Sequence, residues 1–180
     1  LQEDWDNSGL QVGNPEAELK GVVVCLDVTR EVIDQAIDLG ANVIISHHPL
    51  IFSGLKSLSY QDVLGAKLIK AIKNAILIYS SHTSCDLAPG GINDYFFEKL
   101  GLEKISYISQ VGENLGYGAY GRVEGKTSRD LIAMIKEEFD MEDLTLYGDE
   151  DQVLSKVGFV GGSGASFIDD ALALDLDLYI

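Results

Sequence analysis

Apolar residues gather in short blocks along the first hundred residues, and amphipathic stretches separate these blocks. The blocks 21–27, 42–46 and 75–81 are rich in β-branched side chains, which is typical of strands buried on both faces of a parallel sheet. Helical spacing of apolar residues follows or precedes them in 29–40, 60–73 and 90–102. Strands that alternate with helices predict βαβ units, an α/β fold and mostly parallel sheets flanked by helices.

The stretch 29–40 carries both helix-boundary signals. Thr29 is a suitable N-cap, and Gly40 suits the position after the helix end. A predicted apolar stripe between them consists of Val32, Ile33, Ala36, Ile37 and Leu39.

The pattern of apolar and polar residues changes from about residue 105. Residues 117–125 (YGAYGRVEG) read as a glycine-rich strand, and 127–139 as an amphipathic helix capped by Thr127 or Ser128. Further strands are predicted within 144–148, 157–162 and 176–180. We therefore expect two α/β units, 1–108 and 109–180.

The two predicted units share an internal similarity. Segment 22–45 aligns without a gap with segment 157–180, with six identical residues and mostly apolar residues opposite apolar ones. Either the units are related by a pseudo-twofold repeat, or two βαβ units share only their periodicity.

Composition narrows the functional classes. The net charge of −16 argues against a protein that wraps a nucleic-acid backbone, although a bound dication can still attract a small phosphorylated ligand. No apolar run approaches the roughly 20 residues of a membrane span. Two cysteines form no disulfide framework, which favours a reducing cytoplasm.

Both ends of the sequence look cut. There is no initiator Met, and residues 176–180 stop inside a predicted strand. We expect a fragment of a longer chain.

Metal-capable side chains follow three predicted strands: Asp27, the pair His47 and His48, and then His82 with Asp86. In doubly wound sheets, ligands bind outside the carboxyl ends of the strands, so these groups should meet in one crevice. Imidazole and carboxylate are the usual ligands of zinc, iron and manganese.

Adjacent residues of an extended chain point in opposite directions, so His47 and His48 should not easily chelate one ion. Turning toward Pro49, they could instead reach one ion each, with Asp86 between two ions about 3.5–4 Å apart, the spacing of dinuclear hydrolases. Three ligands are too few for two ions, in agreement with a chain that ends early.

Other residues have weaker claims. We interpret His82 as a residue that contacts and orients the metal ligands, and roles as a ligand or as an acid–base group stay open. We interpret Asp27 as the cap of the next helix rather than as a metal ligand. Cys85 and Trp5 are better explained by packing, although Trp5 could cover an aromatic ligand. The segment 161–166 (GGSGAS) suits a strand-to-helix turn better than an anion cradle.

Four motifs, WDNSGLQVG, SHHPLIF, SHTSCDLAPGGIND and GGSGASFIDDAL…DLYI, occur in this order over nearly the whole chain. In them the chain resembles the GTP cyclohydrolase I type 2 homologues, also called the Nif-three-like family. By motif match, the resemblance implies a dinuclear metal site with His47, His48 and Asp86 as ligands. The remaining family ligands, a His and a Glu, have no counterpart up to residue 180.

The resemblance also implies a ring-shaped homohexamer and hydrolytic opening of the guanine ring of GTP by a hydroxide on two divalent ions, Zn, Fe or Mn. The alternative is a non-catalytic, metal-binding regulatory or scaffold protein that forms a ring.

Overall fold

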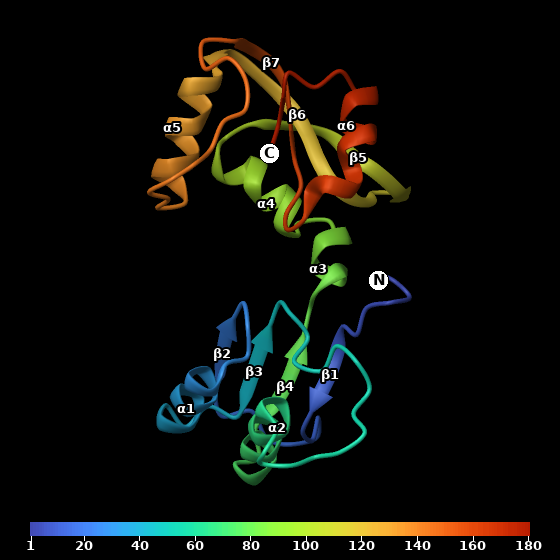
Figure 1. Ribbon diagram of the computed structural model, residues 1–180, viewed down its shortest axis with the longest axis vertical. Coiled ribbons are helices and arrows are strands. Elements are labelled where there is room, and N and C mark those ends of the chain that lie inside the picture. Colours follow the sequence, from blue (N-terminus) through green and yellow to red (C-terminus); the bar gives the residue numbers. More distant parts are fainter. The chain divides into compact units, whose positions relative to one another are not determined.

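A computed structural model describes residues 1–180, which form two compact units, Leu1–Cys85 and Asp86–Ile180. Each unit contains one four-stranded sheet and helices that pack on it (Figure 1). The predicted α/β class with flanking helices is therefore confirmed.

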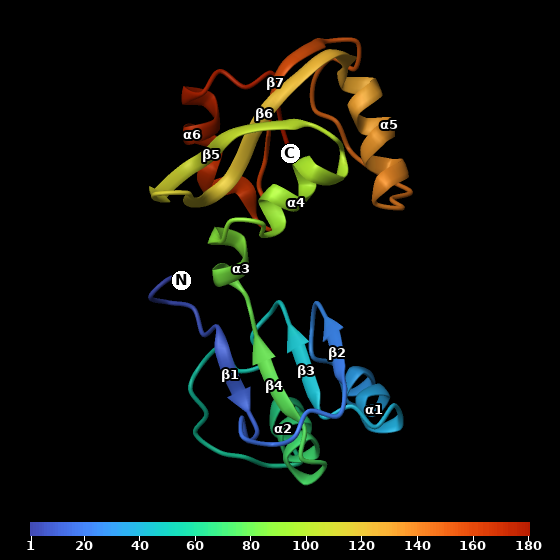
Figure 2. The ribbon, with the colours of Figure 1, turned by 180° about the vertical axis from the view of Figure 1, so that it is seen from behind.

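The first unit is a mixed sheet in the order β1-β4-β3-β2. Its elements are β1 (Gly9–Val12), β2 (Val22–Cys25), α1 (Arg30–Asp38), β3 (Val43–Ser46), α2 (Val63–Lys73) and β4 (Leu77–Ser80). The three predicted strands β2, β3 and β4 are parallel, whereas β1 runs antiparallel along β4 at the sheet edge (Figure 2). Strand β1 was not predicted, because four residues among polar turn residues give too short a pattern.

The two helices of this unit close its core. Helix α1 contacts β2 and β3, α2 contacts β1 and β4, and the helices touch each other, so they cover the same face of the sheet. Thr29 caps α1 by accepting a hydrogen bond from the Val32 amide, and Gly40 follows with φ +68°, both as predicted. Ile33 and Ala36 are fully buried, but Leu39 is 76% exposed, so the stripe is narrower than predicted.

The second unit begins within the short helix α3 (Thr83–Leu87). Its further elements are α4 (Ile92–Lys99), β5 (Glu103–Gly112), β6 (Leu115–Thr127), α5 (Ser128–Glu138), β7 (Val153–Phe159), the 3₁₀ turn η1 (Gly164–Phe167), α6 (Ile168–Ala173) and β8 (Leu178–Tyr179). In the sheet order β5-β6-β7-β8, only β7 and β8 are parallel. The expectation of mostly parallel strands thus holds for the first sheet alone, and 144–148 forms no strand.

The division between the units falls earlier than the boundary expected at residue 109. Strands β5 and β6 form a long hairpin in which Tyr107 pairs with Ala119, so residues 103–108 cannot be separated from the second sheet. Helix α4 also packs there, where Phe96 and Phe97 join a core with Leu131 and Leu154.

The internal similarity of the sequence corresponds to the same strand pairing in both units. Val22 pairs with Val43 in the first sheet, and the aligned residues Val157 and Leu178 pair in the second. Each unit thus contains a parallel βαβ unit in an equivalent register. No helix of the chain has the length and apolar character needed to cross a membrane.

Candidate metal centre

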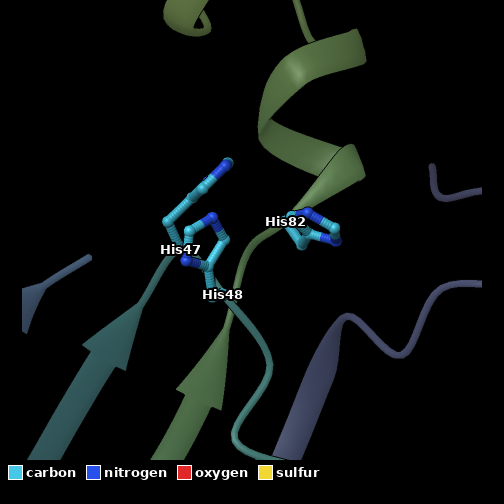
Figure 3. A group of neighbouring side chains, drawn as sticks. All are labelled: His47, His48 and His82. Carbon is cyan, nitrogen blue, oxygen red and sulfur yellow. The ribbon is translucent and has the colours of Figure 1, made fainter. Parts of the chain in front are cut away.

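Three histidines meet at the carboxyl ends of two neighbouring strands. His47 and His48 directly follow β3, and His82 follows β4 (Figure 3). Because β3 and β4 are adjacent and parallel, their carboxyl ends lie at the same edge of the sheet. One ring nitrogen from each histidine lies within 4.8 Å of the others. The predicted meeting of the strand tips is therefore found for all the histidines of the chain.

The backbone around the histidine pair is fixed by the sheet and by two buried serines. The His47 amide donates to the carbonyl of Cys25, the last residue of β2, and the His48 amide donates to the carbonyl of Leu26, the next residue. The Ser46 hydroxyl donates to the His48 carbonyl at 2.8 Å and lies 2.8 Å from the Ser80 hydroxyl. The chain bends at this point, and the two rings lie 5.1 Å apart between their centroids. The bend agrees with the expected turn toward Pro49, and the binding of one ion by each ring stays a prediction.

Each imidazole has its Nδ1 next to an oxygen. The partners are the Ser81 carbonyl for His47 at 3.0 Å, Asp27 Oδ1 for His48 at 2.9 Å and Asp6 Oδ1 for His82 at 2.8 Å. A carbonyl or an ionised carboxylate only accepts hydrogen bonds, so each Nδ1 must carry the proton. In the neutral rings, Nε2 therefore keeps its lone pair. This is the usual arrangement of metal-binding histidines, whose second nitrogen donates to an acceptor.

Asp6 is the most heavily bonded group near the cluster. Its carboxylate side chain is fully buried and accepts hydrogen bonds from His82, Thr83, Ser8 and the Asn7 amide. Burial by itself would raise the pKa of Asp6, but the hydrogen bonds from Thr83, His82 and Ser8 outweigh it and hold the pKa well below its usual range. Asp6 is therefore ionised and fixes the orientation of the His82 ring.

The sequence did not reveal this role of Asp6. The motif that contains it reads locally as turn chemistry, while Thr83 and His82 lie far along the chain. Its only signal was membership of the WDNSGLQVG motif.

Asp27 has a different role from the one predicted. Thr29, not Asp27, caps helix α1, and the Asp27 carboxylate binds His48 instead. Because this pair is about half exposed, its electrostatic contribution to stability is small.

The remaining predicted residues fall in different places. His82 belongs to the histidine cluster itself, with its centroid 5.2 Å from that of His47 and 5.7 Å from that of His48. Asp86 lies in α3 within the second unit, and its carbonyl accepts a hydrogen bond from Asn93. Cys85 is a free, partly buried thiol.

The surroundings of segment 161–166 and of Trp5 show what these two weaker candidates do in the fold. Segment 161–166 is a turn held by its neighbours, since the Gly161 amide donates to Asn93 and the Tyr179 hydroxyl donates to the Gly164 carbonyl. Trp5 is 60% exposed, so the expectation that it packs in the core is wrong.

Comparison with known proteins places this arrangement in a family. A sequence model of Duf34/NIF3 (NGG1p interacting factor 3) matches residues 1–180. The chain belongs to the Duf34/NIF3 family. Among curated members, it is similar to the GTP cyclohydrolase 1 type 2 homologs of Clostridium acetobutylicum and Clostridium perfringens, at 36% and 38% identity. All of the chain aligns, to 69% and 70% of the length of these relatives.

Solved structures of the family share the fold. The chain is similar to a hypothetical protein of Staphylococcus aureus at a TM-score of 0.91 and 29% identity, over 99% of this chain and 72% of that one. It is also similar to a Bacillus cereus protein related to NIF3, at 0.90 and 26%, over 99% and 76%.

Proposed function

We propose that the protein is a metal-dependent hydrolase that binds two divalent ions, Zn, Fe or Mn, through His47, His48 and Asp86. Its proposed reaction is hydrolytic opening of the guanine ring of GTP, as the name of its Clostridium relatives suggests. The observation that carries the proposal is the histidine cluster, in which each Nδ1 faces an acceptor.

The donor set fits divalent ions of this kind. Neutral imidazoles suit zinc and iron, and a carboxylate such as Asp86 adds the negative charge that two ions require. One nitrogen of each of the three rings lies within 4.8 Å of the others, which is close enough for imidazoles to gather around bound metal. We retain His82 as a supporting residue, although its place in the cluster also suits a ligand.

The chain's own residues hold the imidazoles ready for such ions. Asp6, Asp27 and the Ser81 carbonyl keep the Nδ1 protons in place, so that in each neutral ring Nε2 is the nitrogen with a lone pair for metal. A bound divalent ion supplies Lewis acidity that activates water for hydrolysis.

The proposal extends to assembly and location. We propose a homohexamer on the basis of the family resemblance, and a cytoplasmic location because Cys25 and Cys85 are both free thiols.

Metal content and turnover of the purified protein test this function. We expect at least one ion per chain by elemental analysis after loading with Zn, Mn or Fe, because His47, His48 and Asp86 alone are too few ligands to fill two ion sites, and release of formate from GTP. His47→Ala and Asp86→Asn should lower the metal content and abolish turnover. Asp38→Asn, an exposed carboxylate of α1, is the matched control and should change neither.

The outcomes separate the two functional classes. Bound metal without turnover of any nucleotide would support the non-catalytic scaffold instead of the hydrolase. Less than one ion per chain in the loaded protein would contradict both.

A further inference from the structure

Two large aromatic side chains stand exposed beside the histidine cluster. Trp5 is 60% exposed and Phe52 is 55% exposed, although both residue types are usually buried. The Trp5 ring meets the His82 ring edge to face, with 6.0 Å between centroids, and lies 6.2 Å from the Phe52 ring. The cluster is thus flanked by an aromatic surface within the first unit.

This surface is held in place by the polar residues that follow Trp5. The Asn7 side chain donates to the Ile51 carbonyl at 2.6 Å, and the Ile51 amide donates to the Gln11 side chain at 3.1 Å. Asn7 and Gln11 are also bonded to each other, because the Gln11 amide group donates to the Asn7 carbonyl at 2.7 Å. Ile51 directly precedes Phe52, so the loop that carries Phe52 is fastened to the segment that carries Trp5.

Asp6 adds the third fixed point. It lies next to Trp5 in the chain and binds His82 through the hydrogen bond described above. The network of Asp6, Asn7 and Gln11 therefore holds the segments that carry the two aromatic rings next to the histidine. Exposed aromatic rings on a backbone held in this way have few rotatable bonds and lose little conformational entropy when a planar ligand stacks on them.

We propose that Trp5 and Phe52 form a stacking site for a planar heteroaromatic ring, such as a purine base, beside the histidine cluster. This assignment rests on the proposed function, because it gives the substrate of that site an aromatic class. Stacking supplies affinity without reading the hydrogen-bonding edge of the base, so the site selects for a ring rather than for one base.

Trp5 is the only tryptophan of the chain, which makes its fluorescence a direct probe. Guanosine monophosphate titrated into EDTA-treated protein should quench this fluorescence saturably, after correction with free N-acetyltryptophanamide. Ribose 5-phosphate, which has the phosphate but no aromatic ring, should not quench it. Working without metal separates this test from the proposed function.

Variants complete the test. Phe52→Leu should weaken guanosine monophosphate binding at least about tenfold. Tyr147→Leu, at a tyrosine that is 93% exposed in the second unit, should leave binding unchanged. Equilibrium dialysis of Trp5→Leu should show the same loss without relying on fluorescence.

Three results would overturn the stacking site: equal quenching by ribose 5-phosphate, unchanged binding in Phe52→Leu, or a blue-shifted Trp5 emission that shows the ring covered by another chain. If the protein binds metal and hydrolyses GTP but shows no quenching, the stacking site fails and the proposed function stands. If quenching occurs but no metal binds, the proposed function fails and the stacking site stands.

Discussion

At the scale of single residues, the carboxylates of Asp6 and Asp27 perform the same task in different surroundings. Each accepts the Nδ1 proton of one histidine, but Asp6 is buried among several donors whereas Asp27 is 59% exposed. Burial makes every lost hydrogen bond costly, since the donors left behind cannot turn to water. The two residues should therefore differ in their effects on stability, and they should also differ in their effects on metal binding, because only Asp27 holds a proposed ligand, His48.

Replacing each by asparagine tests this difference. Asp6→Asn places an amide group against donors, and we expect a loss of about 3 kcal/mol in the free energy of unfolding. Asp27→Asn should change that free energy by less than about 0.5 kcal/mol. Asp27→Asn should weaken zinc binding about 10- to 100-fold, because the ligand His48 loses its fixed tautomer, and Asp6→Asn should weaken it less, because His82 only supports the ligands. Urea unfolding followed by circular dichroism and zinc titration measure the two effects, and equal destabilisation by both variants would contradict the account.

At the scale of elements, helix boundaries followed from local chemistry, whereas some strands did not. Thr29 and Thr127 both cap the helices that the sequence assigned to them. Asp62 caps α2, which begins at Val63, three residues after the predicted start at residue 60. The capping box of α5 is complete, since Thr127 and Asp130 bond reciprocally. Such caps depend on neighbouring residues alone and can be read from the sequence.

Removing the α5 cap should be measurable and sensitive to pH. Thr127→Val should lower the stability by about 1 kcal/mol. The hydrogen bonds from the Thr127 amide and hydroxyl lower the pKa of Asp130. This contribution is therefore fully present above the ordinary carboxyl pKa near 4 and is lost as the pH falls through the lower folded value.

The difference in thermal midpoint between wild type and Thr127→Val should accordingly narrow below about pH 4. Thr145→Val, an exposed residue outside helices and strands, is the control and should match wild type at every pH. A difference in thermal midpoint that grows as the pH falls would contradict the predicted direction of the pH dependence.

At the scale of the whole molecule, apolar side chains remain on the edge of the first sheet. Val22 and Val24 on the edge strand β2 are 46% and 76% exposed. An exposed apolar edge offers both free hydrogen-bonding groups and a surface for another chain. This edge suits association with another chain, which the proposed hexamer requires.

Light scattering after gel filtration measures the assembly. We expect a mass near that of six chains of 19.5 kDa. Val24→Lys should shift the protein to smaller species, because a charged edge strand resists pairing. The exposed Thr145→Lys serves as its control. A monomeric wild-type protein would contradict the hexamer.

The sequence by itself determined the α/β class, most helix boundaries and the candidates His47, His48, His82 and Asp86, because periodicity, caps and motifs depend on residues close along the chain. Tertiary structure decided which groups meet. It brought Asp6 to His82, turned His47 and His48 toward each other, moved Asp27 from a cap to a histidine partner and left Trp5 exposed. It also made the second sheet mostly antiparallel, because β5 pairs with β6 in a hairpin that the local sequence pattern did not predict. These outcomes depend on contacts between distant segments, and no local pattern of residues fixes such contacts.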